Sequence, residues 1–202
     1  MKRIGITGPT GAGKTTVLKA LESLGVGILD ADAVYYDLLS GSDGMKKQLR
    51  ERFGDGILDN SGAIDRKKLG SIVFADPAAL LDLNRITHKY VGEELGRREE
   101  LAAAAGVKAV AIDAIALIES GLGKSCDAVV CVLAPAEVRI RRIMARDGIP
   151  EEYARSRVEA QKPDSFYREH SDLVLENDGS VSPEVFAARA LESLKQILKQ
   201  IL

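Results

Sequence analysis

A glycine-rich run near the start of the chain has the residue types and spacing of a phosphate-binding loop. Residues 8–15, Gly-Pro-Thr-Gly-Ala-Gly-Lys-Thr, fit the pattern G-x-x-x-x-G-K-[ST]. An apolar run precedes them and a helical pattern follows. Glycine permits backbone angles that turn several N–H groups inward, and the new helix adds a positive dipole end. The alternative is a glycine-rich turn that matches the pattern by chance.

Two side chains of this loop have distinct expected roles in holding a nucleotide. Lys14 is expected to reach the β- and γ-phosphates of ATP, and the Thr15 hydroxyl is expected to bind Mg²⁺. The loop residues predicted to bind ATP are Gly8, Gly11, Ala12, Gly13, Lys14, Thr15 and Thr16.

Carboxylates follow the second apolar run of the chain. Asp30 and Asp32 lie where residues 26–30 give way to a helical pattern. Ligands of open α/β folds bind at the carboxyl ends of the strands, and a kinase needs a carboxylate that accepts the proton of the acceptor hydroxyl. Asp32 is the candidate for this role, and Asp30 is expected to help hold the loop or a metal-bound water. Alternatively, both are solvated aspartates that cap a helix.

Two further acidic residues follow the third apolar run. Asp113 ends the run 108–113, in the manner of the metal-side aspartate of phosphate-loop enzymes, although strands often end in Asp. Glu119 follows six residues later and could face the same cleft or the solvent. Asp113 and Glu119 are therefore candidates for substrate binding.

Three arginines share one face of a predicted helix that starts at Pro135 and ends before Gly148. They are Arg139, Arg142 and Arg146, at spacings of three and four residues. Grouped guanidinium groups repel one another unless an anion joins them, and triphosphate is a suitable partner. The alternative is a solvated basic face with acidic neighbours.

The elements that must position these residues alternate between strands and helices. Several apolar runs are nearly continuous, which is typical of parallel strands covered on both faces. The chain is therefore expected to have an α/β fold. The last helix should begin with Ser182 as N-cap and turn an apolar stripe toward the core. The predicted strands are 3–7, 26–30, 108–113, 128–133 and 172–176.

Two segments interrupt this alternation. About 75 residues without a good strand follow the second strand, too many for a simple crossover, and their patterns are helical. The segment 148–170 is charged and offers little core of its own, and it is expected to be a lid that excludes water from the site. The predicted division is a core of 1–33, 106–147 and 171–202, a helical insertion of 34–105 and a lid of 148–170.

Composition narrows the function classes. The 202-residue chain has a formal net charge of −2, which gives no general attraction to nucleic acid or anionic membranes. Two cysteines and two histidines make a structural zinc site improbable. No signal peptide or membrane span is evident, and no disulfide framework is implied, so a cytoplasmic location is expected. Oligomeric state is not predicted.

Two other classes of phosphate-loop protein are alternatives to a kinase. A GTP-binding switch would need Asp-x-x-Gly after a strand, but residues 59–62 lie in a turn-rich segment, and no Asn-Lys-x-Asp signature occurs. A catalytically silent binding protein remains an alternative. Within the kinases, the acceptor is open as well, and a nucleoside or nucleotide is an alternative acceptor to the one that the family resemblance below implies.

Taken together and in order, these stretches resemble the dephospho-CoA kinase family. The matching stretches are "TGPTGAGKTTV", "LDADAVYYDLL", "LGSIVFADPAALLDLNRITHKYV", "DAIALIESGL", "APAEVRIRRIMARDG", "RVEAQ" and "DLVLENDG". The resemblance implies a P-loop kinase fold with a five-stranded parallel sheet, and transfer from ATP with Mg²⁺ to the ribose 3′-hydroxyl of dephospho-CoA.

The resemblance also implies roles for individual residues. Asp32 matches the family's proposed base, and Arg142 matches an arginine near the nucleotide. Asn177 and Gly179 match a loop near the adenine. The insertion 34–105 matches the region that binds CoA, and a substrate-side role follows for His88.

Overall fold

The computed structural model describes residues 1–202, which divide into two compact units. Unit 1 comprises residues 1–29 and 101–202, and unit 2 comprises residues 30–100. Each unit has an apolar core of its own. The α/β part of the chain is therefore discontinuous in sequence, and a helical unit is inserted after its second strand.

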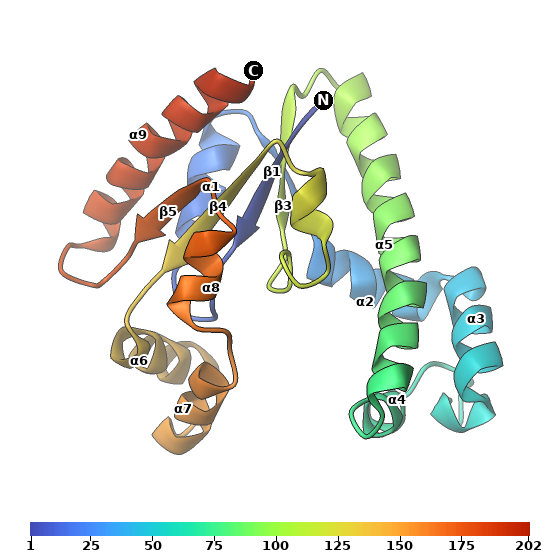
Figure 1. Cartoon of the computed structure of the whole chain (residues 1–202). Coiled ribbons are helices and arrows are strands. Elements are labelled where there is room, and N and C mark those ends of the chain that lie inside the picture. Colours follow the sequence, from blue (N-terminus) through green and yellow to red (C-terminus); the bar gives the residue numbers. More distant parts are fainter. The chain divides into compact units, whose positions relative to one another are not determined.

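Unit 1 is built on a parallel sheet in which β1 is the central strand. The strand order is β2-β3-β1-β4-β5, so β1 lies between β3 and β4 (Figure 1). All six residues of β4 are buried, as expected for a strand covered on both faces. All five predicted strands are confirmed to within one residue. Their bounds are β1 Lys2–Thr7, β2 Gly27–Asp30, β3 Ala109–Asp113, β4 Ala128–Leu133 and β5 Leu173–Glu176.

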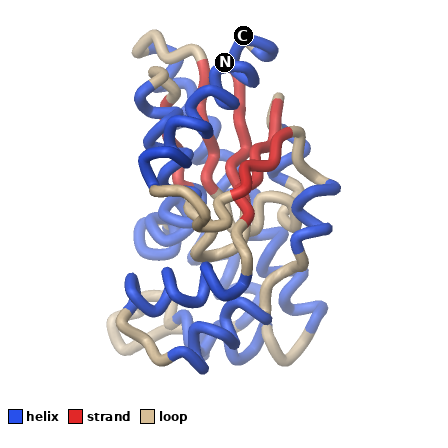
Figure 2. The backbone as a smooth tube through the Cα atoms, turned by 90° about the vertical axis from the view of Figure 1, so that its left-hand side faces the viewer, coloured by secondary structure: helices blue, strands red, loops and turns tan.

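Helices α1 and α9 cover one face of this sheet with a shared core. In α9 the Ser182 hydroxyl accepts from the Val185 N–H, as predicted for the N-cap. The predicted apolar stripe is confirmed, because Ala190, Leu194 and Leu198 are buried in the core that β1 and α1 also line. Both chain termini lie at the same end of unit 1 (Figure 2). The helices of unit 1 are α1 Lys14–Ser23, η2 Leu122–Ser125, α6 Ala136–Asp147, α7 Glu151–Glu159, α8 Asp164–Glu169 and α9 Pro183–Ile201.

Segment 148–170 contains α7 and α8, and as expected it has little core of its own, because its few buried residues pack against other elements of unit 1. Ala154 and Val158 of α7 pack with Ile140 and Ile143 of α6. Tyr167 of α8 is 2% exposed and packs against Cys131 and Leu133 of β4. The apolar residues of this segment are few and separated by charges, so their pattern did not reveal a packed face. Cys131, which lies in the apolar run 128–133, is fully buried.

The start of α6 differs in detail from the expectation. Pro135 precedes the helix as its N-cap, and the first helical residue is Ala136. The end agrees with the expectation, because Gly148 has φ 65° and ends the helix in the left-handed conformation.

Unit 2 consists of helices around a small core. Met45, Leu49 and Ile57 are fully buried there, and Leu69 is nearly so. Aspartate caps recur, since the Asp65 carboxylate accepts from the N–H groups at the start of α4. Its helices are α2 Ala31–Gly41, α3 Asp43–Phe53, η1 Asp55–Ile57, α4 Arg66–Val73 and α5 Pro77–Ala104, whose last residues belong to unit 1.

Residues 59–62, which were weighed as part of a GTP switch, form a turn in unit 2. The Asp59 carboxylate accepts from the Ser61 hydroxyl and from the N–H groups of Ala63 and Ser61, and these bonds hold the pKa of Asp59 below its usual range. An isolated bridge joins Leu58 and Ile64 on either side of the turn. The Asp59 carboxylate therefore stabilises a local turn. A GTP switch would need this aspartate directly after a strand of the sheet, and it does not lie there.

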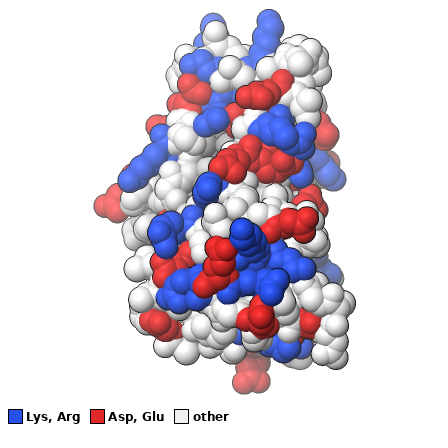
Figure 3. Space-filling model, turned by 90° about the vertical axis from the view of Figure 1, so that its right-hand side faces the viewer, with Lys and Arg blue, Asp and Glu red and all other residues white.

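Charged side chains of both signs are mixed on the surface. Figure 3 shows Lys and Arg interspersed with Asp and Glu on one face, in keeping with the formal net charge of −2. None of the helices combines the length and apolar composition that crossing a bilayer requires.

Candidate active site

The glycine-rich run forms a loop between β1 and α1 whose shape excludes side chains at two positions. Gly8 has φ 131°, and a Cβ there would lie 2.2 Å from the carbonyl oxygen of Val132 on β4. Gly13 has φ 109°, and its Cβ would lie 2.3 Å from Nδ2 of Asn177. The backbone angles and the close neighbours both require glycine at these two positions. A turn that matched the phosphate-loop pattern only by chance would not need glycine at both.

The loop brings together the groups expected to hold phosphates. The ammonium of Lys14 donates to the Gly8 carbonyl at 2.8 Å, so it lies across the loop. Thr15 is exposed in the first turn of α1, where the N–H groups of a helix start are unbonded within the helix. The arrangement suits a polyphosphate with an ammonium on one side and a hydroxyl close by.

Two other carbonyl groups of the loop, those of Gly11 and Ala12, are bound by side chains from outside it. Nη1 of Arg142, on α6, donates to the carbonyls of Gly11 and Ala12, both at 3.2 Å. Its Nη2 donates to Oδ1 of Asn177 at 3.0 Å, and Nδ2 of Asn177 donates to the Ala12 carbonyl at 2.8 Å. Partial burial lowers the pKa of Arg142. Arg142 and Asn177 thus brace the loop with one connected set of hydrogen bonds.

The three arginines predicted to share one face have different surroundings. Arg139 is 6% exposed, and burial lowers its pKa. Arg146 is exposed and pairs with Asp147 at 2.6 Å. Glu137, an acidic residue of the same helix, pairs with Arg155 and not with these three arginines. The alternative that these arginines are solvated therefore holds for Arg146. The side chains of Arg139 and Arg142 instead lie near the loop.

Gly179 lies in the turn after β5, two residues beyond Asn177. Its φ of 81° is in the region that favours glycine, and a Cβ there would lie 3.6 Å from the side chain of Val138 on α6. The turn that carries Asn177 is therefore next to α6, and Gly179 shapes it.

Asp113 lies at the edge of the sheet from which the loop emerges. It pairs with Ile6 in the register of β3 and β1. The following residues are tied to the same edge, because Thr7 Oγ1 donates to the Ile115 carbonyl at 3.4 Å. The carboxylate of Asp113 is thus carried on the strand beside the one that leads into the loop.

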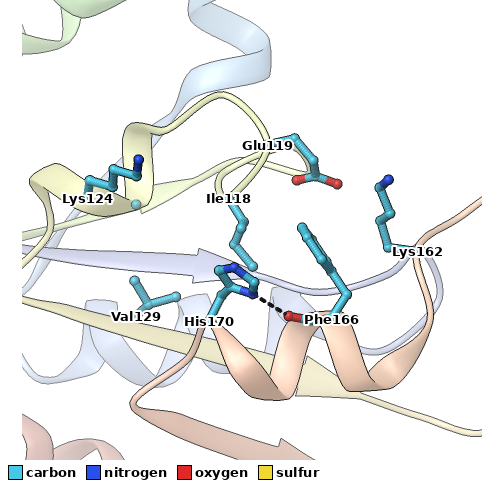
Figure 4. A pocket seen from close by; sticks show the side chains of 8 residues that line it. Ile118, Glu119, Lys124, Val129, Lys162, Phe166 and His170 are labelled. Atoms are coloured by element: carbon cyan, nitrogen blue, oxygen red, sulfur yellow. Dashed lines mark hydrogen bonds between the residues drawn. The ribbon is translucent and has the colours of Figure 1, made fainter.

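Glu119 lies further along this segment and lines a cavity of about 480 Å³. Figure 4 shows its carboxylate on the same side of the cavity as Lys162, while Lys124 lies on the other side. Phe166 and Ile118 form apolar walls, and Nδ1 of His170 is 2.8 Å from the Phe166 carbonyl. Glu119 therefore faces a cavity of unit 1.

The remaining predicted residues belong to unit 2. The Asp30 carboxylate accepts from the Ala33 N–H at 2.8 Å, so the helix-capping alternative describes Asp30. Asp32 is exposed in the first turn of α2. His88 is exposed on α5, and partial burial of its ring lowers its pKa.

The side chain of Gln161, for which no role was predicted, contacts the loop. Its Oε1 accepts from the Thr10 N–H at 3.1 Å and from Nη1 of Arg139 at 3.3 Å. Gln161 lies between α7 and α8, where no periodic pattern places a side chain. The one available signal was its position at the end of the "RVEAQ" stretch.

Comparison with solved structures identifies the class of protein. A crystal structure of a protein from Thermus thermophilus superposes with a TM-score of 0.74 at 32% identity, over 100% of this chain and 98% of that one. A shikimate kinase from Acinetobacter baumannii shares the fold with a TM-score of 0.54 at 20% identity, over 100% and 96% of the two chains. The chain therefore has the fold of the P-loop kinases.

Sequence comparison then gives the family. The family model described as dephospho-CoA kinase matches residues 2–183. A dephospho-CoA kinase from Corynebacterium efficiens is 37% identical over 100% of both chains. Another from Dehalococcoides mccartyi is 36% identical over 88% of this chain and 89% of the relative. The chain belongs to the dephospho-CoA kinase family and is a phosphotransferase, which confirms the predicted resemblance and fold.

Proposed function

We propose that this kinase transfers the γ-phosphoryl group of ATP to the ribose 3′-hydroxyl of dephospho-CoA, giving coenzyme A and ADP. Membership of the family supports the reaction. The observation that carries the site assignment is the loop itself. Its glycines fit where no side chain could, and the Lys14 ammonium lies across it, 2.8 Å from the Gly8 carbonyl.

The loop residues are proposed to hold the phosphates of ATP. The N–H groups of Gly11, Gly13, Lys14 and Thr15 and the Lys14 ammonium would contact the β- and γ-phosphates. The N–H groups of Ala12 and Thr16 donate to the carbonyls of Pro9 and Gly13. Arg142 would add positive charge, which stabilises the transferring group. Contact of Arg146 with ATP stays a prediction, because its guanidinium pairs with Asp147 in this structure. Asn177 and Gly179 would lie near the adenine, as the family resemblance implies. Asp113, Glu119 and His88 stay predictions for the acceptor side.

Asp32 is proposed to act as the base. Its carboxylate would accept the proton as the 3′ O–H bond breaks and the oxygen bonds to the γ-phosphorus. The bond from that phosphorus to the bridging oxygen breaks in the same step, and ADP leaves with the electron pair. The match of Asp32 to the family's proposed base supports this role, and its position in the exposed first turn of α2 is compatible with it.

Mg²⁺ fits the residues of the loop. No group of three or more His, Cys, Asp and Glu side chains gathers in the structure. Kinase sites seldom need one, because Mg²⁺ is held there by one or two protein oxygens together with substrate phosphates. The exposed hydroxyl of Thr15 is the proposed protein oxygen. When bound, the ion would neutralise charge on the phosphates.

The reaction is tested by measuring ADP formation with dephospho-CoA as the only varied acceptor. The product should carry one added phosphoryl group at the ribose 3′ position. Nucleosides and nucleotides offered in its place test the alternative of another small-molecule kinase. No ADP formation that depends on dephospho-CoA would refute the proposed acceptor.

The role of Asp32 is tested by Asp32→Asn, with Asp43→Asn as the matched control. Asp43 is also exposed in the first turn of a helix, the neighbouring α3. Removal of a positioned base lowers kcat by about 10²–10⁴-fold. We expect this loss for Asp32→Asn with ATP binding kept, and no loss for Asp43→Asn. A near-normal kcat for Asp32→Asn excludes it as the base.

The expected cytoplasmic location and lack of nucleic-acid partners stay predictions.

A further inference from the structure

The amide oxygen of Gln161 joins two parts of unit 1 that are far apart in sequence. It accepts from the Thr10 N–H of the phosphate loop at 3.1 Å and from Nη1 of Arg139 at 3.3 Å. A single side chain therefore ties the turn between α7 and α8 to the loop and to α6. Removing it would leave both donors without this acceptor.

Arg139 lies directly behind the loop. A Cβ on Gly11 would lie 2.9 Å from the carbonyl oxygen of Arg139, so α6 and the loop backbone are in close contact there. The Arg139 side chain is 6% exposed, it forms no ion pair, and its Nε has no hydrogen-bond partner. A buried guanidinium is costly unless other charges or hydrogen bonds compensate it. A polyphosphate on the loop is an anion that would do so.

The segment that carries Gln161 is fixed in place at α7. Arg155 pairs with Glu137 at 2.8 Å, and Arg157 pairs with Asp147 at 2.7 Å, so two ion pairs join α7 to α6. The apolar contacts of Ala154 with α6 lie on the same helix. Gln161 thus approaches the loop from a packed support, which a positioning role requires.

Three of the loop residues are held from behind by three different groups. Gln161 binds the N–H of Thr10, Arg142 binds the carbonyls of Gly11 and Ala12, and Asn177 also binds Ala12. Gln161 is the member of this set that belongs to segment 148–170. It is also neutral, so it adds no second carboxylate to that of Asp164, whose charge already acts on Arg139.

We propose that Gln161 is a positioning residue for the phosphate loop. Its amide oxygen fixes the Thr10 N–H and the Arg139 guanidinium, and its neutrality keeps the positive charge of Arg139 available to the triphosphate. The inference rests on the ATP site of the proposed function and not on the identity of the acceptor. It is tested by ATP binding, which remains measurable whether or not dephospho-CoA is phosphorylated.

Two substitutions separate the hydrogen bonds from the charge. Gln161→Leu removes the acceptor and keeps the size, so ATP should bind about tenfold more weakly, the scale expected for a buried donor left without a partner. Gln161→Glu keeps an acceptor for both donors but pairs Arg139 with a carboxylate. It should also weaken ATP binding about tenfold, without lowering the melting temperature. Gln196→Leu, an exposed change on α9, is the matched control.

The measurements are the Kd for ATP by calorimetric titration, the melting temperature, and KM and kcat with ATP as the varied substrate. The expected pattern is a raised Kd and KM for ATP in both Gln161 variants and wild-type values in Gln196→Leu. Gln161→Leu with wild-type ATP affinity and only a lower melting temperature overturns the positioning role. Gln161→Glu with wild-type ATP affinity overturns the role of the Arg139 charge.

Discussion

Asn177→Ala tests the hydrogen bonds that hold the phosphate loop from behind. The Asn177 side chain is 8% exposed, donates to the Ala12 carbonyl at 2.8 Å and accepts from Arg142 at 3.0 Å. A buried group left without its partner costs about 1–3 kcal/mol. Two groups lose a partner, the Ala12 carbonyl and Nη2 of Arg142. Because Arg142 keeps its bonds to the loop carbonyls, each of these two losses should cost an amount in the lower half of this range. The free energy of unfolding should fall by about 3 kcal/mol.

Thermal and chemical denaturation measure this loss. In a chain of this size, 1 kcal/mol shifts the melting temperature by about 2–4 °C, so a fall of about 6–12 °C is expected. ATP should also bind more weakly, because the Ala12 backbone loses a contact that fixes it. Asn60→Ala, at an exposed turn of unit 2, is the control and should change stability by less than about 0.5 kcal/mol.

A second substitution at the same position divides the two contacts. Asn177→Asp keeps an acceptor for Arg142 and gives it a charge, but places an oxygen where Nδ2 lies 2.8 Å from the Ala12 carbonyl. Stability should lie between those of the wild type and Asn177→Ala, and ATP binding should remain weakened. An Asn177→Ala protein as stable as the Asn60→Ala control, with wild-type ATP affinity, would falsify the view that this side chain holds the loop.

Three further outcomes follow from the structure. Gly8→Ala should destabilise the fold far more than Gly25→Ala in denaturant titrations. A Cβ at Gly8 meets a carbonyl at 2.2 Å and one at Gly25 meets nothing within 4 Å, although both have positive φ; equal losses would contradict the packing. Burial raises the pKa of the Cys131 thiol to about 12, so a thiol reagent at pH 8 should modify partly exposed Cys126 and reach Cys131 only on unfolding. Partial burial lowers the pKa of His88, so the folded state binds fewer protons there, and stability should fall as pH drops through about 6.5. Denaturation of His88→Asn should show a smaller dependence on pH across that range, and an identical dependence would rule His88 out as its source.

The strands and helix ends could be predicted because their signals are local. Each strand is a short apolar run, and β4 is buried along its whole length. Ser182 and Gly148 mark helix ends by their own hydrogen-bonding and backbone preferences. The phosphate loop was equally local, because its glycines, lysine and threonine lie within eight residues.

The support of the loop could not be predicted in the same way. Asn177 and Ala12 are 165 residues apart in sequence, and no local pattern tells which carbonyl an asparagine will bind. The spacing predicted three arginines on one face of α6, but it could not predict which of them are buried. Arg139 is buried, whereas Arg146 lies in solvent. Gln161 lies in a turn, where the fold of the two adjacent helices decides its direction.

The central place of β1 in the sheet has a consequence for how the chain matures during synthesis. β1 and the loop leave the ribosome first, but both neighbours of β1 begin beyond residue 108. Residues 30–100 have a core of their own and can collapse in the meantime, since compact units fold as such. The groups that support the loop appear between Val132 and Asn177. The nucleotide site is therefore among the first sequences translated and among the last structures completed, so a nascent chain that stops short of residue 177 should have no high-affinity ATP site.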